Sequence, residues 1–191
     1  MTISVDGTFG QKTAEALNAI NPALLLPAIC AHAEQYYREL EGRRPEMKAW
    51  FANWNHRAAW MPPPIVKMSC SDFGEAIEVV IATHEGGFQD RQDDPGNWTP
   101  DGRLKGTKYG ISAHSFPDED IKNLSLNRAE ELYRQVWGKF ALISDQRVLI
   151  KALDLAVNLQ WGGHGHATEI LQRAINECAA SATRSIAASS S

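Results

Sequence analysis

Apolar and aromatic positions repeat at helical spacing along the first third of the chain, and this pattern predicts helices there. Asn21 and Pro22 supply the N-cap and the first-turn proline of one helix, which the periodic pattern continues to Gly42. Pro45 can open another helix. We expect the aromatic face of that helix to pack into the protein rather than to bind a ligand; its members are Met47, Trp50, Phe51 and Trp54.

The pattern after residue 70 predicts further helices around one irregular region. Asp72 followed by Glu75 resembles a capping box, which predicts a helix that begins there. A polar, glycine-containing stretch comes next, and its turn signals predict an irregular loop with a small β-hairpin. The expected fold class is therefore mainly α with one small hairpin. Helical spacing resumes at about 125–138, 145–159 and 165–178.

Proline and serine content divides the chain into segments. Three successive prolines at 62–64 remove three backbone donors, so we expect a linker over 61–69. It would join a helical segment at 1–60 to a second segment at 70–178. Residues 179–191 are rich in Ala and Ser with little to bury, which predicts a disordered tail.

Composition and charge exclude several classes of function. The 191 residues are 43% hydrophobic and 22% charged, as is typical of a compact globular protein. A net charge of −4 is too acidic for a protein whose affinity comes from neutralising phosphates, so we expect no nucleic acid as main partner. No apolar run could span a bilayer and the first residues lack the features of a secretory signal, so we expect synthesis in the cytoplasm and no membrane insertion.

Cysteines and histidines do not indicate a metal centre. Cys30, Cys70 and Cys178 form no CxxC pair, and we expect them to be buried free thiols. His164 and His166 lack the carboxylate or thiolate that would complete a metal site. We expect neither a metal nor another cofactor.

Glu85 is a candidate general acid. It comes at the end of an apolar helical run, where partial desolvation would keep a proton on a carboxyl group near neutral pH. Gly86 and Gly87 follow it and would let a substrate approach the backbone closely. The alternative is an exposed glutamate at a helix end, with Gly86 as the C-cap.

A second group of carboxylates follows within nine residues, at Asp90, Asp93 and Asp94. Two facing carboxyl groups are the minimum for cleaving a glycosidic bond, because one protonates the leaving oxygen and the other activates water or stabilises charge at the sugar. A solvated acidic loop is the alternative. The spacing does not fit a calcium loop.

Several motifs follow one another in a fixed order along the second segment. They are His84-Glu85-Gly86-Gly87-Phe88, Asp94-Pro95-Gly96-Asn97-Trp98-Thr99, Lys105-Gly106-Thr107-Lys108-Tyr109-Gly110-Ile111-Ser112 and, in a later helix, Asp154-Leu155-Ala156-Val157-Asn158. Together they resemble glycoside hydrolase family 108, the lysozyme-like N-acetylmuramidases of phage and prophage endolysins.

This resemblance implies a lysozyme-like fold and roles for five residues. Glu85 corresponds to the acid of the family's glutamate-glycine-glycine motif, and Asp94 and Thr107 would hold or activate the water. Asp93 or Asp90 could take the place of Asp94, and Thr107 could instead pin the hairpin. The resemblance also places Tyr109 and Asn158 along the sugar cleft, although Asn158 could be a bracing group.

Residues 3–60 resemble the peptidoglycan-binding segment that ordinarily closes these muramidases. The motifs are Val5-Asp6-Gly7-Thr8-Phe9-Gly10-Gln11-Lys12-Thr13, Tyr36-Tyr37-Arg38, Arg43-Arg44-Pro45 and Trp54-Asn55-His56-Arg57-Ala58. Because this segment here precedes the catalytic one, the sequence predicts a circular permutation. We expect the segment to dock on its own chain in a monomer, with a domain-swapped dimer as the alternative.

The expected function is peptidoglycan hydrolysis at the β-1,4 bond between N-acetylmuramic acid and N-acetylglucosamine, with glycan strands as the partner. The alternative is a peptidoglycan-binding or secretion-assisting module that keeps the fold without hydrolysis. The endolysin resemblance implies action on the cell wall after release by a holin or a secretion system.

Overall fold

The computed structural model describes residues 2–45, 48–63, 72–84, 86–159 and 165–189. Helices dominate this part of the chain, so the predicted mainly α fold is confirmed. Two short 3-10 helices lie at Pro95–Asn97 (η2) and Gly138–Leu142 (η3). One antiparallel hairpin pairs β1 (Thr107–Lys108) with β2 (Ile111–Ser112). The helices are α1 (Gln11–Asn18), α2 (Pro22–Arg43), α3 (Lys48–Ala59), α4 (Phe73–His84), α5 (Leu126–Trp137), α6 (Gln146–Leu159) and α7 (His166–Ser189).

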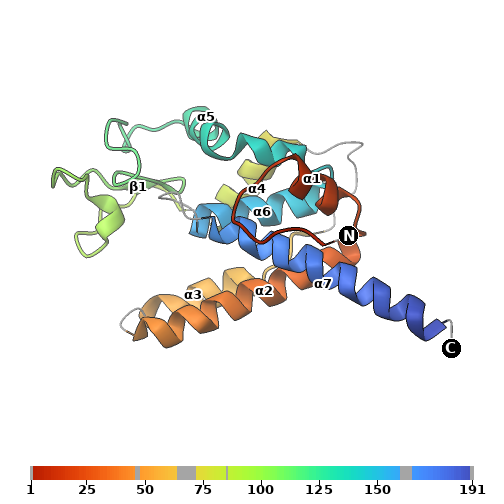
Figure 1. Cartoon of the computed structure of the whole chain (residues 1–191). Helices are drawn as coiled ribbons and strands as arrows, with labels where there is room; N and C mark the ends of the chain where they lie inside the picture. Colours follow the sequence, from red (N-terminus) through yellow and green to blue (C-terminus); the bar gives the residue numbers. More distant parts are fainter. Residues whose placement is uncertain (1, 46–47, 64–71, 85, 160–164, 190–191) are drawn as a thin grey trace. The chain divides into compact units, whose positions relative to one another are not determined.

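The chain forms two compact units, and the first unit contains both ends of the sequence. Residues 1–72 and 139–191 make up the first unit, and residues 73–138 make up the second. In the first unit, α2 packs along α7 and contacts α3 and α6 (Figure 1). The N-terminal segment therefore packs on helices from the C-terminal end of the sequence within this unit.

Helix α2 begins and packs as its sequence predicts. The Asn21 side chain accepts a hydrogen bond from the Ala23 N–H at 2.9 Å, and Pro22 occupies the first turn. One face of α2 is buried, with Leu25 and Ile29 fully shielded from solvent. This face supplies much of the core of the first unit.

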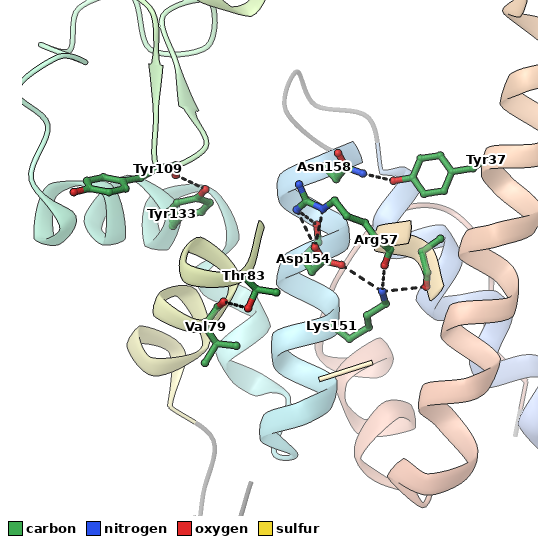
Figure 2. A network of polar contacts seen from close by, with 10 residues as sticks. Tyr37, Arg57, Val79, Thr83, Tyr109, Tyr133, Lys151, Asp154 and Asn158 are labelled. Carbon is green, nitrogen blue, oxygen red and sulfur yellow. Dashed lines mark hydrogen bonds and ion pairs between the residues drawn. The ribbon is translucent and has the colours of Figure 1, made fainter. Parts of the chain in front are cut away.

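Helix α6 is buried on nearly all sides, and it carries two charged side chains into the core. Lys151 is 0% exposed and Asp154 is 1% exposed, and Arg57 of α3 joins them (Figure 2). The Arg57 guanidinium reaches Asp154 Oδ1 at 2.8 Å, and Lys151 Nζ lies 3.3 Å from Asp154 Oδ2. Lys151 also donates to the Arg57 and Ala58 carbonyl oxygens. Because every charge here has a partner, the network holds α3 against α6.

Two side chains of α7 fasten the residues before α1: Asn176 exchanges hydrogen bonds with the backbone of Ile3, and Gln172 makes the larger set. Gln172 accepts hydrogen bonds from the N–H groups of Asp6 and Gly7 and donates to the Asp6 carboxylate and the Thr8 carbonyl. The hydrogen bond from Gln172 holds the pKa of Asp6 below its usual value. This clamp joins the two ends of the sequence inside one unit.

The second unit contains α4, α5 and the loop region with the hairpin. Ser125 caps α5 by accepting from the Arg128 N–H at 3.1 Å. The β1–β2 turn consists of Tyr109 and Gly110, whose φ angles are +53° and +73°, so both central residues adopt the left-handed conformation that a two-residue hairpin turn requires. The predicted hairpin is therefore confirmed.

The C-terminal tail is helical, and most of the expected linker is not described by the structure. We expect a disordered tail from residue 179, but α7 continues to Ser189. Alanine has the highest helix propensity, and no proline or glycine interrupts this stretch. Most of the expected linker, together with Cys70 and His164, lies outside the described residues.

No helix in the described ranges is both long and apolar enough to cross a membrane.

Candidate active site

The backbone next to the hairpin brings residue 89 against Thr107. The Gln89 N–H donates to the Thr107 carbonyl at 2.9 Å, and the Thr107 N–H donates to the Gln89 carbonyl at 2.8 Å. Gly106 allows this approach, because a Cβ there would lie 2.5 Å from the Gln89 carbonyl oxygen and 2.7 Å from the Phe88 ring. Its φ of +86° also favours glycine. The hairpin is thus held closely against the strand-like segment that follows Gly87.

Asp94 is held in a defined orientation at the start of η2. Its Oδ1 accepts from the Gly96 N–H at 2.9 Å, so the carboxylate caps this short helix. Its Oδ2 accepts from Gln89 Nε2 at 3.0 Å. Asp94 is half-buried, which leaves part of its side chain accessible.

Asn97 connects Asp94 to Thr107, and its side chain is fully buried. Its Nδ2 donates to Gln89 Oε1 at 2.7 Å and to the Arg91 carbonyl at 2.9 Å. Its Oδ1 accepts from Thr107 Oγ1 at 2.7 Å and from Gln89 Nε2 at 3.0 Å. Three hydrogen bonds therefore lead from the Asp94 carboxylate through Gln89 and Asn97 to the Thr107 hydroxyl. We call Asp94, Gln89, Asn97 and Thr107 the amide network.

The other two candidate carboxylates have different surroundings. Asp93 is exposed and pairs with Arg91 at 2.6 Å, and this bond holds the pKa of Asp93 below its usual value. Asp90 is exposed. Among the three candidate carboxylates, Asp94 is the one that the amide network links to Thr107.

Tyr109 connects the hairpin turn to the residue that follows Glu85. Its N–H donates to the Gly86 carbonyl at 3.4 Å, and its own carbonyl accepts from the buried Tyr133 hydroxyl of α5 at 2.8 Å (Figure 2). The Lys108 ammonium lies 5.1 Å from the centre of its ring. Glu85 itself lies outside the described residues. The turn is therefore held from two sides, by the Gly86 carbonyl and by Tyr133 of α5.

Asn158 lies at the end of α6, in the first unit. Its Nδ2 donates to the Tyr37 hydroxyl of α2 (Figure 2). Tyr37 is buried, and burial raises the pKa of its phenol. Its ring centre lies 5.8 Å from that of Trp54. The structure thus gives Asn158 a bracing contact between α6 and α2, which is the alternative role that the sequence leaves open.

Gln89 and Asn97 are site residues that sequence reasoning did not single out. Asn97 belongs to the Asp-Pro-Gly-Asn motif, and its place directly after a turn signal could have marked it. Gln89 carries no such signal. Among the described residues, no cluster of three or more His, Cys, Asp or Glu side chains could hold a metal ion.

Comparison with known families gives two matches along the chain. Residues 79–159 match the model described as Glycosyl hydrolase 108, and residues 1–59 match the model described as Predicted Peptidoglycan domain. The first match spans all four residues of the amide network as well as Glu85 and Asn158. No curated protein and no solved structure is significantly similar to the chain. The chain therefore contains a segment that is similar to glycosyl hydrolase 108 and, before it, a segment that is similar to a predicted peptidoglycan domain, and the two matches together support a peptidoglycan-related glycosyl hydrolase role.

Proposed function

We propose that the protein hydrolyses the β-1,4 bond between N-acetylmuramic acid and N-acetylglucosamine in peptidoglycan. The two family matches support the substrate class. The observation that carries the proposal is the amide network, because it holds a carboxylate and a hydroxyl in fixed orientations on the loop and hairpin that follow Glu85. An inverting glycosidase needs such a fixed group to activate water on the face of the sugar opposite its general acid.

In the proposed reaction, Glu85 protonates the glycosidic oxygen while the bond to the anomeric carbon of the muramic acid breaks. Asp94 accepts a proton from water as the water oxygen bonds to that carbon. Thr107 orients the same water. The glycan is thereby divided into one product with a new reducing end and one with a free hydroxyl group.

We propose further roles for the rest of the chain. Tyr109 would contact a sugar ring at the hairpin, and Asn158 would brace α6 against α2 through Tyr37 rather than bind sugar. Residues 1–59 would hold the enzyme on the cell wall, in a monomer whose segment order is permuted. The packing of α2 along α6 and α7 supports docking within one chain.

A comparison of two glutamate variants on purified peptidoglycan tests the role of the acid. We expect Glu85→Gln to lower the release of reducing ends by about 10² to 10⁴-fold, since general acid catalysis contributes this much. Glu78→Gln is the matched control, because Glu78 is an exposed glutamate of α4. If Glu85→Gln were as active as the control, Glu85 would not be the acid.

Binding measurements separate this proposal from the binding-module alternative. Peptidoglycan that retains the protein during sedimentation but releases no reducing ends would favour the non-catalytic module.

Two variants at Thr107 test the water-holding role. Thr107→Val keeps the shape of the side chain and removes the hydroxyl, whereas Thr107→Ser keeps the hydroxyl. We expect Thr107→Val to lose at least tenfold in kcat and Thr107→Ser to remain close to the parent. Equal activities of the two variants would show that Thr107 only packs.

A further inference from the structure

We propose that Gln89 and Asn97 are positioning residues that fix the direction of each hydrogen bond at the site, so that Asp94 and Thr107 both face the attacking water as acceptors. The inference rests on the proposed function, because it assigns the orientation of the water in that reaction.

The peptide of Arg91 fixes the orientation of Asn97. A backbone carbonyl can only accept, and the Arg91 carbonyl lies 2.9 Å from the Asn97 side-chain amide. The atom that faces it must therefore be Nδ2. The other atom of the amide, Oδ1, then faces Thr107 and Gln89 and accepts from both.

The same residue fixes the orientation of Gln89. A backbone N–H can only donate, and the Arg91 N–H lies 3.1 Å from the Gln89 side-chain amide. The atom that faces it must be Oε1. Nε2 then points to Asp94 Oδ2 at 3.0 Å and to Asn97 Oδ1 at 3.0 Å. The two amides are thus oriented independently by two different groups of one residue, and the two orientations agree.

The orientations of the two amides determine which hydrogen bonds Asp94 and Thr107 can form with a water molecule. A threonine hydroxyl has one hydrogen, and Thr107 gives it to Asn97 Oδ1, so the free lone pairs of Thr107 Oγ1 accept. Asp94 receives hydrogens from Gln89 and from the Gly96 N–H and accepts in both bonds. A water bound to both groups must donate one hydrogen to each. Its lone pairs then remain free for the anomeric carbon, and the proton that leaves goes to Asp94.

Gln89→Glu replaces the Nε2 donor, which binds Asp94 Oδ2 and Asn97 Oδ1, by an oxygen and adds one negative charge. The carboxylate keeps an oxygen for the Arg91 N–H and for Asn97 Nδ2, but it places an acceptor opposite Asp94 Oδ2. We expect kcat to fall about 100-fold, as when a catalytic base loses its orientation, while KM changes less than about threefold. Gln92→Glu is the matched control, because Gln92 is exposed on the same loop and undergoes the same chemical change.

A second variant covers the case in which Gln89→Glu does not fold. Gln89→Met keeps the length of the side chain and removes the donor without adding charge. We expect a loss of at least tenfold in kcat with KM retained. Circular dichroism and thermal unfolding of each variant identify any loss that comes from unfolding instead.

The outcomes separate this inference from the proposed function. An active parent beside a folded Gln89→Glu or Gln89→Met with the parent's kcat would overturn the inference alone. A fall in kcat that Gln92→Glu shares would overturn it too, since any added charge on the loop would then suffice. A parent that releases no reducing ends would instead overturn the proposed function.

Discussion

Replacing Asp154 by asparagine should destabilise the first unit strongly. The Asp154 carboxylate is the partner of two buried cations, the Arg57 guanidinium at 2.8 Å and the Lys151 ammonium at 3.3 Å. Asp154→Asn keeps the shape but puts an amide where a charge was. Two cations with side-chain exposures of 8% and 0% would then lose this counter-charge.

The expected magnitude follows from this burial. Removing one member of a buried ion pair costs about 3–5 kcal/mol, because the remaining charge has lost the interaction that offset its desolvation. For a chain of this length, each kcal/mol corresponds to about 2–4 °C in the melting temperature. We therefore expect Asp154→Asn to melt roughly 6–20 °C below the parent.

Urea unfolding followed by circular dichroism measures this loss directly. Glu39→Gln is the control, because Glu39 pairs with Arg43 at 3.3 Å on the surface, with side-chain exposures of 51% and 67%. Exposed pairs contribute about 0–1 kcal/mol, so this variant should unfold almost as the parent does. A loss below about 1 kcal/mol for Asp154→Asn would refute the claim that this network holds α3 against α6.

Three further predictions follow from single contacts. Gly106→Ala should lower the free energy of unfolding by about 1–3 kcal/mol and remove most of the activity, because its Cβ would lie 2.5 Å from the Gln89 carbonyl oxygen. Gly42→Ala has open space at its Cβ and should raise the free energy of unfolding by about 0.4–1 kcal/mol. Urea unfolding of the two variants measures both changes. Gln172→Ala should speed hydrogen exchange at the two N-terminal amides that this side chain binds, and unchanged exchange would contradict the clamp. The hydrogen bond from Arg128 holds the pKa of Glu119 below its usual value. The stability that this pair contributes is therefore present above the unfolded-state pKa of Glu119 and is lost as pH falls through its folded-state pKa. Glu119→Gln should reduce the change in the free energy of unfolding between about pH 5 and pH 3.

Local sequence patterns were sufficient for most of the secondary structure. Asn21 and Pro22 define the start of α2 through the cap and the first-turn proline, and both features depend only on neighbouring residues. The low complexity of residues 179–191 predicts disorder, whereas α7 continues to Ser189, because alanine has the highest helix propensity.

The contacts that define the site could not be predicted from local patterns. Gln89 and Asn97 exchange hydrogen bonds between side-chain amides, and no periodicity marks such a pair. The partnership of Arg57 with Asp154 joins residues 97 positions apart, so it depends on how α3 packs against α6. The sequence did supply Asp94 and Thr107 as candidates, and the structure supplies the network that connects them.

Mass analysis of the fragments that the parent releases from purified peptidoglycan, after borohydride reduction of the new reducing ends, shows which glycosidic bond is cleaved. We expect fragments that end in reduced N-acetylmuramic acid. Fragments that end in reduced N-acetylglucosamine, or no fragments at all, would contradict the proposed function.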